Sequence, residues 1–203
     1  MGKIEIKKEE VAEMMKLKGN VKGAILKGHF NYIKDLKGEK GVKLVENRLE
    51  ELGYPLEINK IDVIKWYPEA HSCLVIMVAA ETFNWGKEDV FKMAYEAPKY
   101  SFIVKLLMQH FVKIEKTFHM VPRYWRQNFD FSEMETVGFN EKEKYGIIRI
   151  KNYHKYHPLI CVYHQGYFQK IAEIMLGQSK VNVEHTKCLF EGNLYEEYKI
   201  TWK

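Results

Sequence analysis

The sequence predicts an α+β fold, in which a helical N-terminal half packs on a small antiparallel sheet with one long C-terminal-half helix and encloses a ligand pocket. Apolar residues recur at helical spacing through residues 1–120, whereas residues 121–203 alternate as strands do on either side of one helix, 158–176. Composition predicts the pocket. Hydrophobic residues make up 46% of the chain and aromatic residues 14%, which suits a large core or a cavity lined by rings.

The first half is expected to fold into consecutive helices. Residues 69–83 are apolar on nearly all sides, which indicates a buried helix. A short helix should follow Trp85-Gly86, because Glu88 and Asp89 would stand in its first turn, where the helix dipole favours acids. Apolar positions three and four apart predict further helices over residues 8–17, 24–36, 40–52 and 100–117.

The second half is expected to form strands around one helix. A polar turn at residues 140–144 joins two alternating segments, which predicts a hairpin. Pro158 opens a strong helical pattern that Gly177 ends. The expected strands are 133–138, 145–151, 181–183, 188–190 and 195–202.

Size and charge limit the possible functions. The 203 residues contain no linker or repeat, so a single ligand-binding domain over 1–203 is expected. The net charge of +5 comes from scattered lysines and not from a basic stripe, so no nucleic-acid partner is expected. The longest apolar run, Cys73 to Ala80, has eight residues, whereas a membrane span needs about 20.

Cysteine usage and missing motifs limit the functions further. Three cysteines form no disulfide framework, and the first residues contain no apolar signal segment, so a cytoplasmic protein is expected. The sequence has no phosphate loop, glycine-rich dinucleotide motif, serine-hydrolase motif or zinc-protease motif. Enzymatic activity is therefore not expected.

Residues 158–202 contain motifs that resemble the vinyl-reductase-type domain. Cys161 precedes Gly166-Tyr167 by five residues on the predicted helix, an acidic residue stands shortly before Cys188, and a glycine follows that cysteine by four residues. This family belongs to a superfamily shared with the haem nitric-oxide/oxygen-binding (H-NOX) domains and a TRAPP transport-complex subunit family. The resemblance implies an α+β fold around a small-molecule pocket. In the first half, the chain agrees with the family in the order of elements only.

The resemblance also implies a zinc site. Zinc-binding members of the family use the helix cysteine, an acidic residue, the second cysteine and a cysteine of the final strand. Carried over, these positions are Cys161, Glu184 or His185, Cys188 and Glu196, and His185 has the spacing that Glu184 lacks. A Cys₂-His-Glu tetrahedron is acceptable to zinc. In the alternative interpretation, Cys161 is a small buried hydrophobe and His185 a surface strand residue.

His110 lies on the predicted helix 100–117, where the resembled families carry a pocket histidine. In H-NOX domains it is the axial ligand of the haem iron, and in phenol-sensing relatives it contacts the phenol. The resemblance therefore implies ligand contact or haem ligation by His110. However, the Tyr-x-Ser-x-Arg motif that holds haem propionates is absent, since residues 153–157 lack the serine and the arginine. The alternative is a histidine at the edge of the core.

An aromatic run over residues 119–131 could line the mouth of the pocket, with Arg123 or Arg126 as an anchor for an anion. Alternatively, its rings pack the crossing from helices to sheet. The residues expected to contact a ligand are His110, Tyr124, Trp125 and Phe129.

Three histidines, His154, His157 and His164, surround Cys161 in the sequence. Because Pro158 is expected to start a helix, the first two lie in the loop before it. Solvent-exposed histidines are expected here rather than a metal site.

These patterns predict a small-molecule-binding sensor or carrier domain whose ligand is a small apolar or aromatic molecule. Its output would pass through a signalling partner protein or a homodimer, because the chain has no second domain. One alternative is a haem-binding sensor of NO, O₂ or CO with His110 as axial ligand. Another is a dimeric scaffold or adaptor without a ligand. A third, suggested by the reductase name of the resembled family, is a catalyst that acts on a tetrapyrrole or a similar ring, but no acid–base pair in the sequence supports it.

Overall fold

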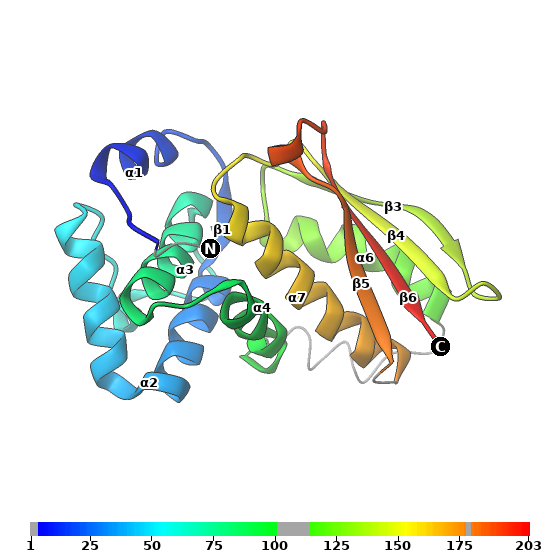
Figure 1. Ribbon diagram of the computed structural model, residues 1–203, viewed down its shortest axis with the longest axis horizontal. Helices are drawn as coiled ribbons and strands as arrows, with labels where there is room; N and C mark the ends of the chain where they lie inside the picture. Colours follow the sequence, from blue (N-terminus) through cyan, green and yellow to red (C-terminus); the bar gives the residue numbers. More distant parts are fainter. Residues whose placement is uncertain (1–3, 101–113, 178–179) are drawn as a thin grey trace.

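The predicted α+β fold class is confirmed. The computed structural model describes residues 4–100, 114–177 and 180–203, and Figure 1 shows a group of N-terminal helices beside a sheet that two further helices cover. The helices are α1 (Lys8–Met14), α2 (Gly23–Glu51), α3 (Glu69–Phe83), α4 (Lys87–Glu96), α6 (Ile114–Asn128) and α7 (Pro158–Leu176), with 3₁₀ turns η1 (Ile58–Lys60), η2 (Ala97–Tyr100) and η3 (Leu189–Glu191).

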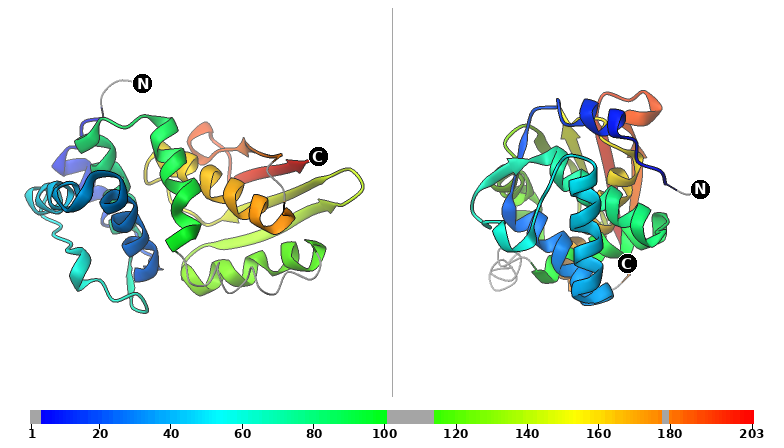
Figure 2. Two further views of the ribbon diagram at one scale, coloured as in Figure 1. Left: turned by 90° about the horizontal axis from the view of Figure 1, so that it is seen from below. Right: turned by 90° about the vertical axis from the view of Figure 1, so that its left-hand side faces the viewer.

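The main sheet is antiparallel, with strand order β3-β4-β6-β5. Its inner face packs on α6 and α7, and the β6 residues Tyr198, Ile200 and Trp202 are all buried there, as their alternation predicted. The outer face is polar, and on it Arg149 Nε donates a hydrogen bond to Glu197 Oε2 at 2.6 Å. Figure 2 shows α7 between this sheet and the N-terminal helices. The strands are β3 (Glu133–Asn140), β4 (Tyr145–Lys151), β5 (Val181–Lys187) and β6 (Glu196–Trp202).

A second, two-stranded sheet was not predicted. It pairs β1 (Asn20–Lys22) with β2 (Trp66–Pro68), and Val21 of β1 also forms a bridge with Phe129 at the end of α6. The strand β1 follows Gly19, whose φ of 135° suits glycine. Strands of three residues are too short to show a periodic pattern. This small sheet brings the starts of α2 and α3 close to the end of α6.

Three expected elements differ from the structure. The helices predicted over 24–36 and 40–52 meet at Gly38, where a φ of 69° interrupts α2. Of the expected strand 188–190, residues 189 and 190 belong to the turn η3, and β5 continues to Lys187, beyond its expected end at residue 183. Of the helix predicted over 100–117, residues 101–113 lie outside the described residues, while α6 extends to Asn128 with Pro122 inside it.

Buried apolar side chains from both halves form one connected core, from Leu26 and Leu74 to Ile150 and Tyr198. Among the described helices, none combines the length and the hydrophobicity that crossing a bilayer requires. A single domain and a cytoplasmic location remain predictions.

Helices α4 and α7 cross closely at Gly166. A Cβ at this position would lie 2.3 Å from the carbonyl oxygen of Phe91 and 3.1 Å from the Cβ of Ala94. Because the carbonyl belongs to the backbone of α4, it cannot move aside as a flexible side chain does. The contact therefore requires glycine in α7 and fixes where the cavity-lining side chains of this helix lie.

Gly166→Ala is expected to destabilise the protein by about 2–3 kcal/mol, because the methyl group forces α4 and α7 apart. Chemical denaturation followed by circular dichroism measures the loss. Gly28→Ala is the matched control, since its Cβ would meet nothing nearer than the Cβ of Tyr100 at 4.0 Å. It should change the stability by about 1 kcal/mol or less, in the stabilising direction. Equal effects of the two substitutions would contradict the close crossing.

Candidate functional site

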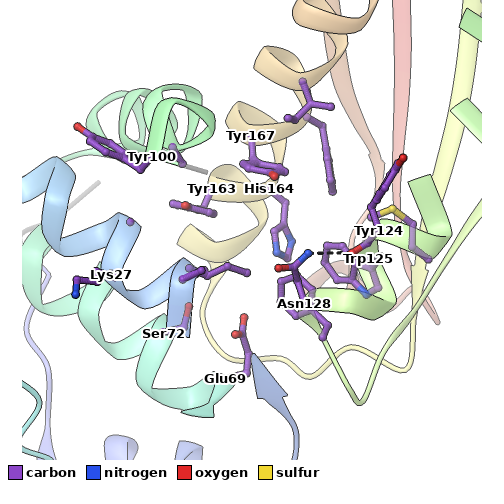
Figure 3. A pocket seen from close by; sticks show the side chains of 18 of the residues that line it. Lys27, Glu69, Ser72, Tyr100, Tyr124, Trp125, Asn128, Tyr163, His164 and Tyr167 are labelled. Atoms are coloured by element: carbon purple, nitrogen blue, oxygen red, sulfur yellow. Dashed lines mark hydrogen bonds between the residues drawn. The ribbon is translucent and has the colours of Figure 1, made fainter. Parts of the chain in front are cut away.

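A cavity of about 450 Å³ lies between the N-terminal helices and the helices α6 and α7. Figure 3 shows side chains converging on it from α2, α3, α6 and α7. Its size is in the range of pockets that hold drug-sized ligands. Its walls are mostly apolar, and Ile76, Ile160 and Met134 are among the lining residues.

Part of the aromatic run predicted to line the mouth of a pocket does line the cavity. Tyr124 and Trp125 line it from α6 and Phe129 from the position just after this helix, whereas Phe131 is not among the lining residues and stacks on His154. The Trp125 indole stacks on Phe129 with ring centroids 3.9 Å apart and donates its N–H to Ser132 Oγ at 3.0 Å. These contacts fix the tryptophan ring at the cavity wall.

Of two other predictions about the pocket, one is wrong and one is not tested by the described residues. Arg123 and Arg126 are exposed and are not among the residues that line the cavity, so the expected anion anchor is wrong. His110 lies outside the described residues, and its contact with a ligand stays a prediction.

Glu69 is a buried acid in the cavity wall. It stands at the start of α3, is 3% exposed and lines the cavity. Its Oε1 accepts a hydrogen bond from the Tyr153 hydroxyl at 2.7 Å, whereas its Oε2 has no hydrogen-bond partner. Burial raises the pKa of Glu69 to about 8, so the carboxyl group is mostly protonated at neutral pH.

Next to Glu69, a neutral histidine network crosses the cavity wall. His29 Nε2 lies 3.0 Å from Ser72 Oγ, and His29 Nδ1 lies 3.3 Å from the Tyr163 hydroxyl. Burial lowers the pKa of His29 to about 3, so the imidazole is uncharged. This network holds Ser72 and Tyr163 in place, and both line the cavity.

His164 was expected at the surface, and that expectation is wrong. It is 5% exposed and lines the cavity from α7, and its Nδ1 has no hydrogen-bond partner. Burial lowers its pKa to about 4. The other two histidines of the run have local roles: His157 Nδ1 accepts from the Leu159 N–H at the start of α7, and His154 Nε2 contacts the Lys18 carbonyl oxygen.

Sequence reasoning missed the polar groups of the cavity. Glu69 could have been found as the one acid at the start of the most apolar helix, 69–83. His164 could have been found from its place on the apolar helix 158–176, one residue after Tyr163. Ser72 offers no such signal.

The four residues predicted to bind zinc lie together. One possible ligand atom from each of Cys161, His185, Cys188 and Glu196 lies within 4.8 Å of all the others. Ligand atoms around a tetrahedral zinc are roughly 3.3–3.8 Å apart, so a small contraction would complete the site. Glu184, the alternative to His185, is exposed and does not belong to the cluster.

Four elements build this cluster. Cys161 lies in the first turn of α7, His185 on β5, Cys188 just before η3, and Glu196 at the start of β6. The pairing of β5 with β6 has a register shift between His185 and Lys187. Glu196 contacts His185 Nε2 through Oε2 and accepts from the Leu189 N–H through Oε1. Burial and the neighbouring carboxylate raise the pKa of the Cys161 thiol.

The cluster and the cavity share a wall. Tyr198 stacks on the His185 ring with centroids 4.6 Å apart, and it lies edge-to-face with the His164 ring, with centroids 6.5 Å apart. Its hydroxyl donates to the Cys161 carbonyl oxygen at 3.3 Å. A change at the cluster can therefore reach the cavity through one ring and one helix.

Comparison with solved structures places the fold among H-NOX domains. An oxygen-binding H-NOX domain related to soluble guanylate cyclases, in its oxygen complex, superposes with a TM-score of 0.63 and 12% identity over 90% of this chain and 95% of its own. An H-NOX protein from S. oneidensis in the Fe(II)NO ligation state superposes with a TM-score of 0.63 and 14% identity, over 90% of this chain and 99% of its own. At such identities the similarity shows the fold alone.

A Cs H-NOX mutant gives a TM-score of 0.64 at 12% identity, over 90% of this chain and 96% of its own. No family model and no curated protein matches the chain. The fold predicted from the resemblance is thus the fold of the H-NOX domains. The links to the vinyl-reductase-type domain and to the TRAPP subunit family remain predictions.

Proposed function

We propose that the protein is a sensor or carrier domain that binds a small organic molecule in the cavity between α2, α3, α6 and α7. The observation that carries this proposal is the cavity of about 450 Å³, which combines ring-lined walls with buried polar groups that lack partners. Buried polar atoms without partners cost free energy unless a ligand satisfies them. A ligand with an apolar body and one polar end would satisfy them.

Helix α7 offers a route for the output. It carries Tyr163 and His164 at the cavity and Cys161 in the cluster with His185, Cys188 and Glu196, so a ligand that moves this helix would also move the β5–β6 end of the sheet. A partner protein or a second copy of the chain would detect that movement. The scaffold alternative predicts a filled core, and the cavity speaks against it.

Haem-based gas sensing is the second candidate. On the solved structures alone it is the better supported function, because they include an oxygen complex and an Fe(II)NO state of H-NOX proteins. The described lining does not fit haem. The two propionates of a haem need cationic partners, but Lys27 is the only lysine or arginine among the described lining residues, and the buried Glu69 carboxyl group supplies no positive charge.

Absorption spectroscopy and native mass spectrometry of freshly purified protein separate the two candidates. The organic-ligand proposal predicts no Soret band, even after haem is added, and an adduct with the mass of an organic molecule. A Soret band that disappears in His110→Ala would instead establish the haem sensor.

Filling the cavity should abolish binding of the organic ligand. Gly28 lines the cavity from α2, and a side chain there would start in open space. Gly28→Leu is expected to remove the adduct seen by native mass spectrometry, whereas Gly28→Ala should keep most of it. A leucine variant that folds and keeps the full adduct would show that the ligand binds elsewhere.

We also propose that Cys161, His185, Cys188 and Glu196 bind one zinc ion as a structural site. The support is their geometry, because four possible ligand atoms lie within 4.8 Å of one another. The comparisons with solved structures do not bear on zinc. Metal analysis of the purified protein should find one zinc per chain. Cys188→Ser should lose it, whereas Cys73→Ser, which alters a buried cysteine outside the cluster, should keep it.

A further inference from the structure

The buried carboxyl group of Glu69 identifies the polar end of the ligand. Glu69 is the only acid among the described residues that line the cavity, and none of the described cations pairs with it. Figure 3 shows its carboxyl group directed from the start of α3 toward the cavity. On the basis of the proposed function, we infer that the ligand is an organic ammonium ion with an apolar body, bound through its nitrogen to the Glu69 carboxylate.

The groups that face Glu69 are neutral donors, contributed by three segments. The Tyr153 hydroxyl occupies Oε1, and Cys73 Sγ approaches the same oxygen at 3.7 Å. Oε2 is therefore the carboxyl oxygen that lacks a partner, and it can accept a hydrogen bond once the group has lost its proton. The facing groups are Ser72 and Cys73 of α3, Tyr153 and Tyr156 of the segment before α7, and Tyr163 of α7.

No positive charge in the described lining neutralises a Glu69 carboxylate. Figure 3 shows Lys27 on α2, apart from Glu69, and the two residues form no ion pair. His29 and His164 are uncharged, because burial lowers their pKa to about 3 and about 4. A ligand that carries its own positive charge would supply what the lining lacks.

The rings around the cavity favour the same class of ligand. Trp125 and Tyr124 line it from α6, Phe129 from the position just after α6, and Tyr163 and Tyr167 from α7. The faces of such rings attract cations and also pack against apolar groups. A ligand with an ammonium group on an apolar body would gain from both the attraction of cations and the apolar packing. An alcohol would gain only from the apolar packing.

Binding of an ammonium ion requires a proton to leave Glu69. Burial raises the pKa of this carboxyl group to about 8, so the free protein holds the proton at pH 7. The ligand keeps its own proton and donates an N–H to Oε2, and the proton of Glu69 passes to the buffer. Binding of a neutral molecule involves no such release.

Three probes of nearly equal shape test the inference: 2-(1-naphthyl)ethylamine, 2-(1-naphthyl)ethanol and 1-ethylnaphthalene. Isothermal titration calorimetry in buffers of different ionisation enthalpy measures affinity and proton release together. We expect the amine to bind tightest, to release close to one proton at pH 7 and to gain about tenfold or more in affinity from pH 6 to pH 8. The alcohol and the hydrocarbon should show neither effect.

Two variants complete the test. Glu69→Gln should weaken binding of the amine by about tenfold or more while the alcohol still binds. Glu197→Gln, which alters a buried carboxylate paired with Arg149 on the outer face of the sheet, should leave both affinities unchanged. If Glu69→Gln does not fold, the proton release and the pH profile of the unmodified protein decide the question.

The outcomes separate the inference from the proposed function. If the alcohol or the hydrocarbon binds and the amine binds more weakly than the alcohol at pH 8, the inference is wrong and the organic-ligand pocket stands. The inference is also wrong if the amine binds without proton release. If none of the three probes binds, both the inference and the pocket are contradicted.

Discussion

Cys161→Ser is expected to lower the free energy of unfolding by about 3–6 kcal/mol and to abolish zinc binding. The substitution removes one of four converging ligands and leaves Glu196, which is 1% exposed, next to His185 without the cation that would compensate its charge. Without the metal, the first turn of α7 loses one of its links to β5 and β6, and the hydrogen bond from the Tyr198 hydroxyl to the Cys161 carbonyl oxygen remains. Denaturation in the presence and absence of a zinc chelator measures the effect.

Cys73→Ser is the control for this prediction. Cys73 is also buried and also lies on a helix, but it contacts Glu69 and not the cluster. Its serine variant should remain sensitive to the chelator, as the unmodified protein is. If the chelator changes neither the unmodified protein nor Cys161→Ser, the four residues form a hydrogen-bonded cluster and not a zinc site.

Glu69→Gln is expected to make the ligand-free protein more stable above pH 8, by up to about 5 kcal/mol, and to change it little below pH 4. The pKa of Glu69 is about 8 in the folded protein, against 4.5 as the ordinary value. Between these values, the folded state holds a proton that the unfolded state has lost. The unmodified protein therefore loses stability as the pH rises from about 4.5 to 8, and glutamine removes this loss.

Glu197→Gln should have the opposite effect. Arg149 holds the pKa of Glu197 below its ordinary value, so this carboxylate stabilises the fold at neutral pH and loses that effect as the pH falls. Its replacement should cost about 1 kcal/mol at pH 7, because the pair is partly exposed. Stability curves from pH 4 to 9 measure both variants. A Glu69→Gln curve parallel to that of the unmodified protein would show that Glu69 is not a buried neutral acid.

Most of the fold was predictable because its elements are long and periodic. The helices 69–83 and 158–176 match the predicted bounds, since a wide apolar face and clear end signals such as Gly177 define them. The strands β1 and β2 were missed because three residues carry no period. The continuation of α6 through Pro122 was missed because proline ordinarily ends or kinks a helix.

The candidate site was predictable where residue type and spacing carry the chemistry. The cluster around Cys161 followed from a motif, and the rings of α6 followed from a dense aromatic run. The acid Glu69 and the imidazole of His164 were not found, because their roles depend on burial by distant segments. Tyr153, which bonds Glu69, lies 84 residues away in the sequence.

The indole N–H signals of the four tryptophans test the binding pocket most directly. Only Trp125 is among the described residues that line the large cavity, and its N–H is fixed by Ser132. In ¹H–¹⁵N spectra, titration with 2-(1-naphthyl)ethylamine or 2-(1-naphthyl)ethanol should shift the signal of Trp125, assigned with Trp125→Phe, and the shift should saturate. The signals of Trp66, Trp85 and Trp202 should move much less. If the Trp125 signal stays in place while both probes are in excess, the cavity is not the ligand site.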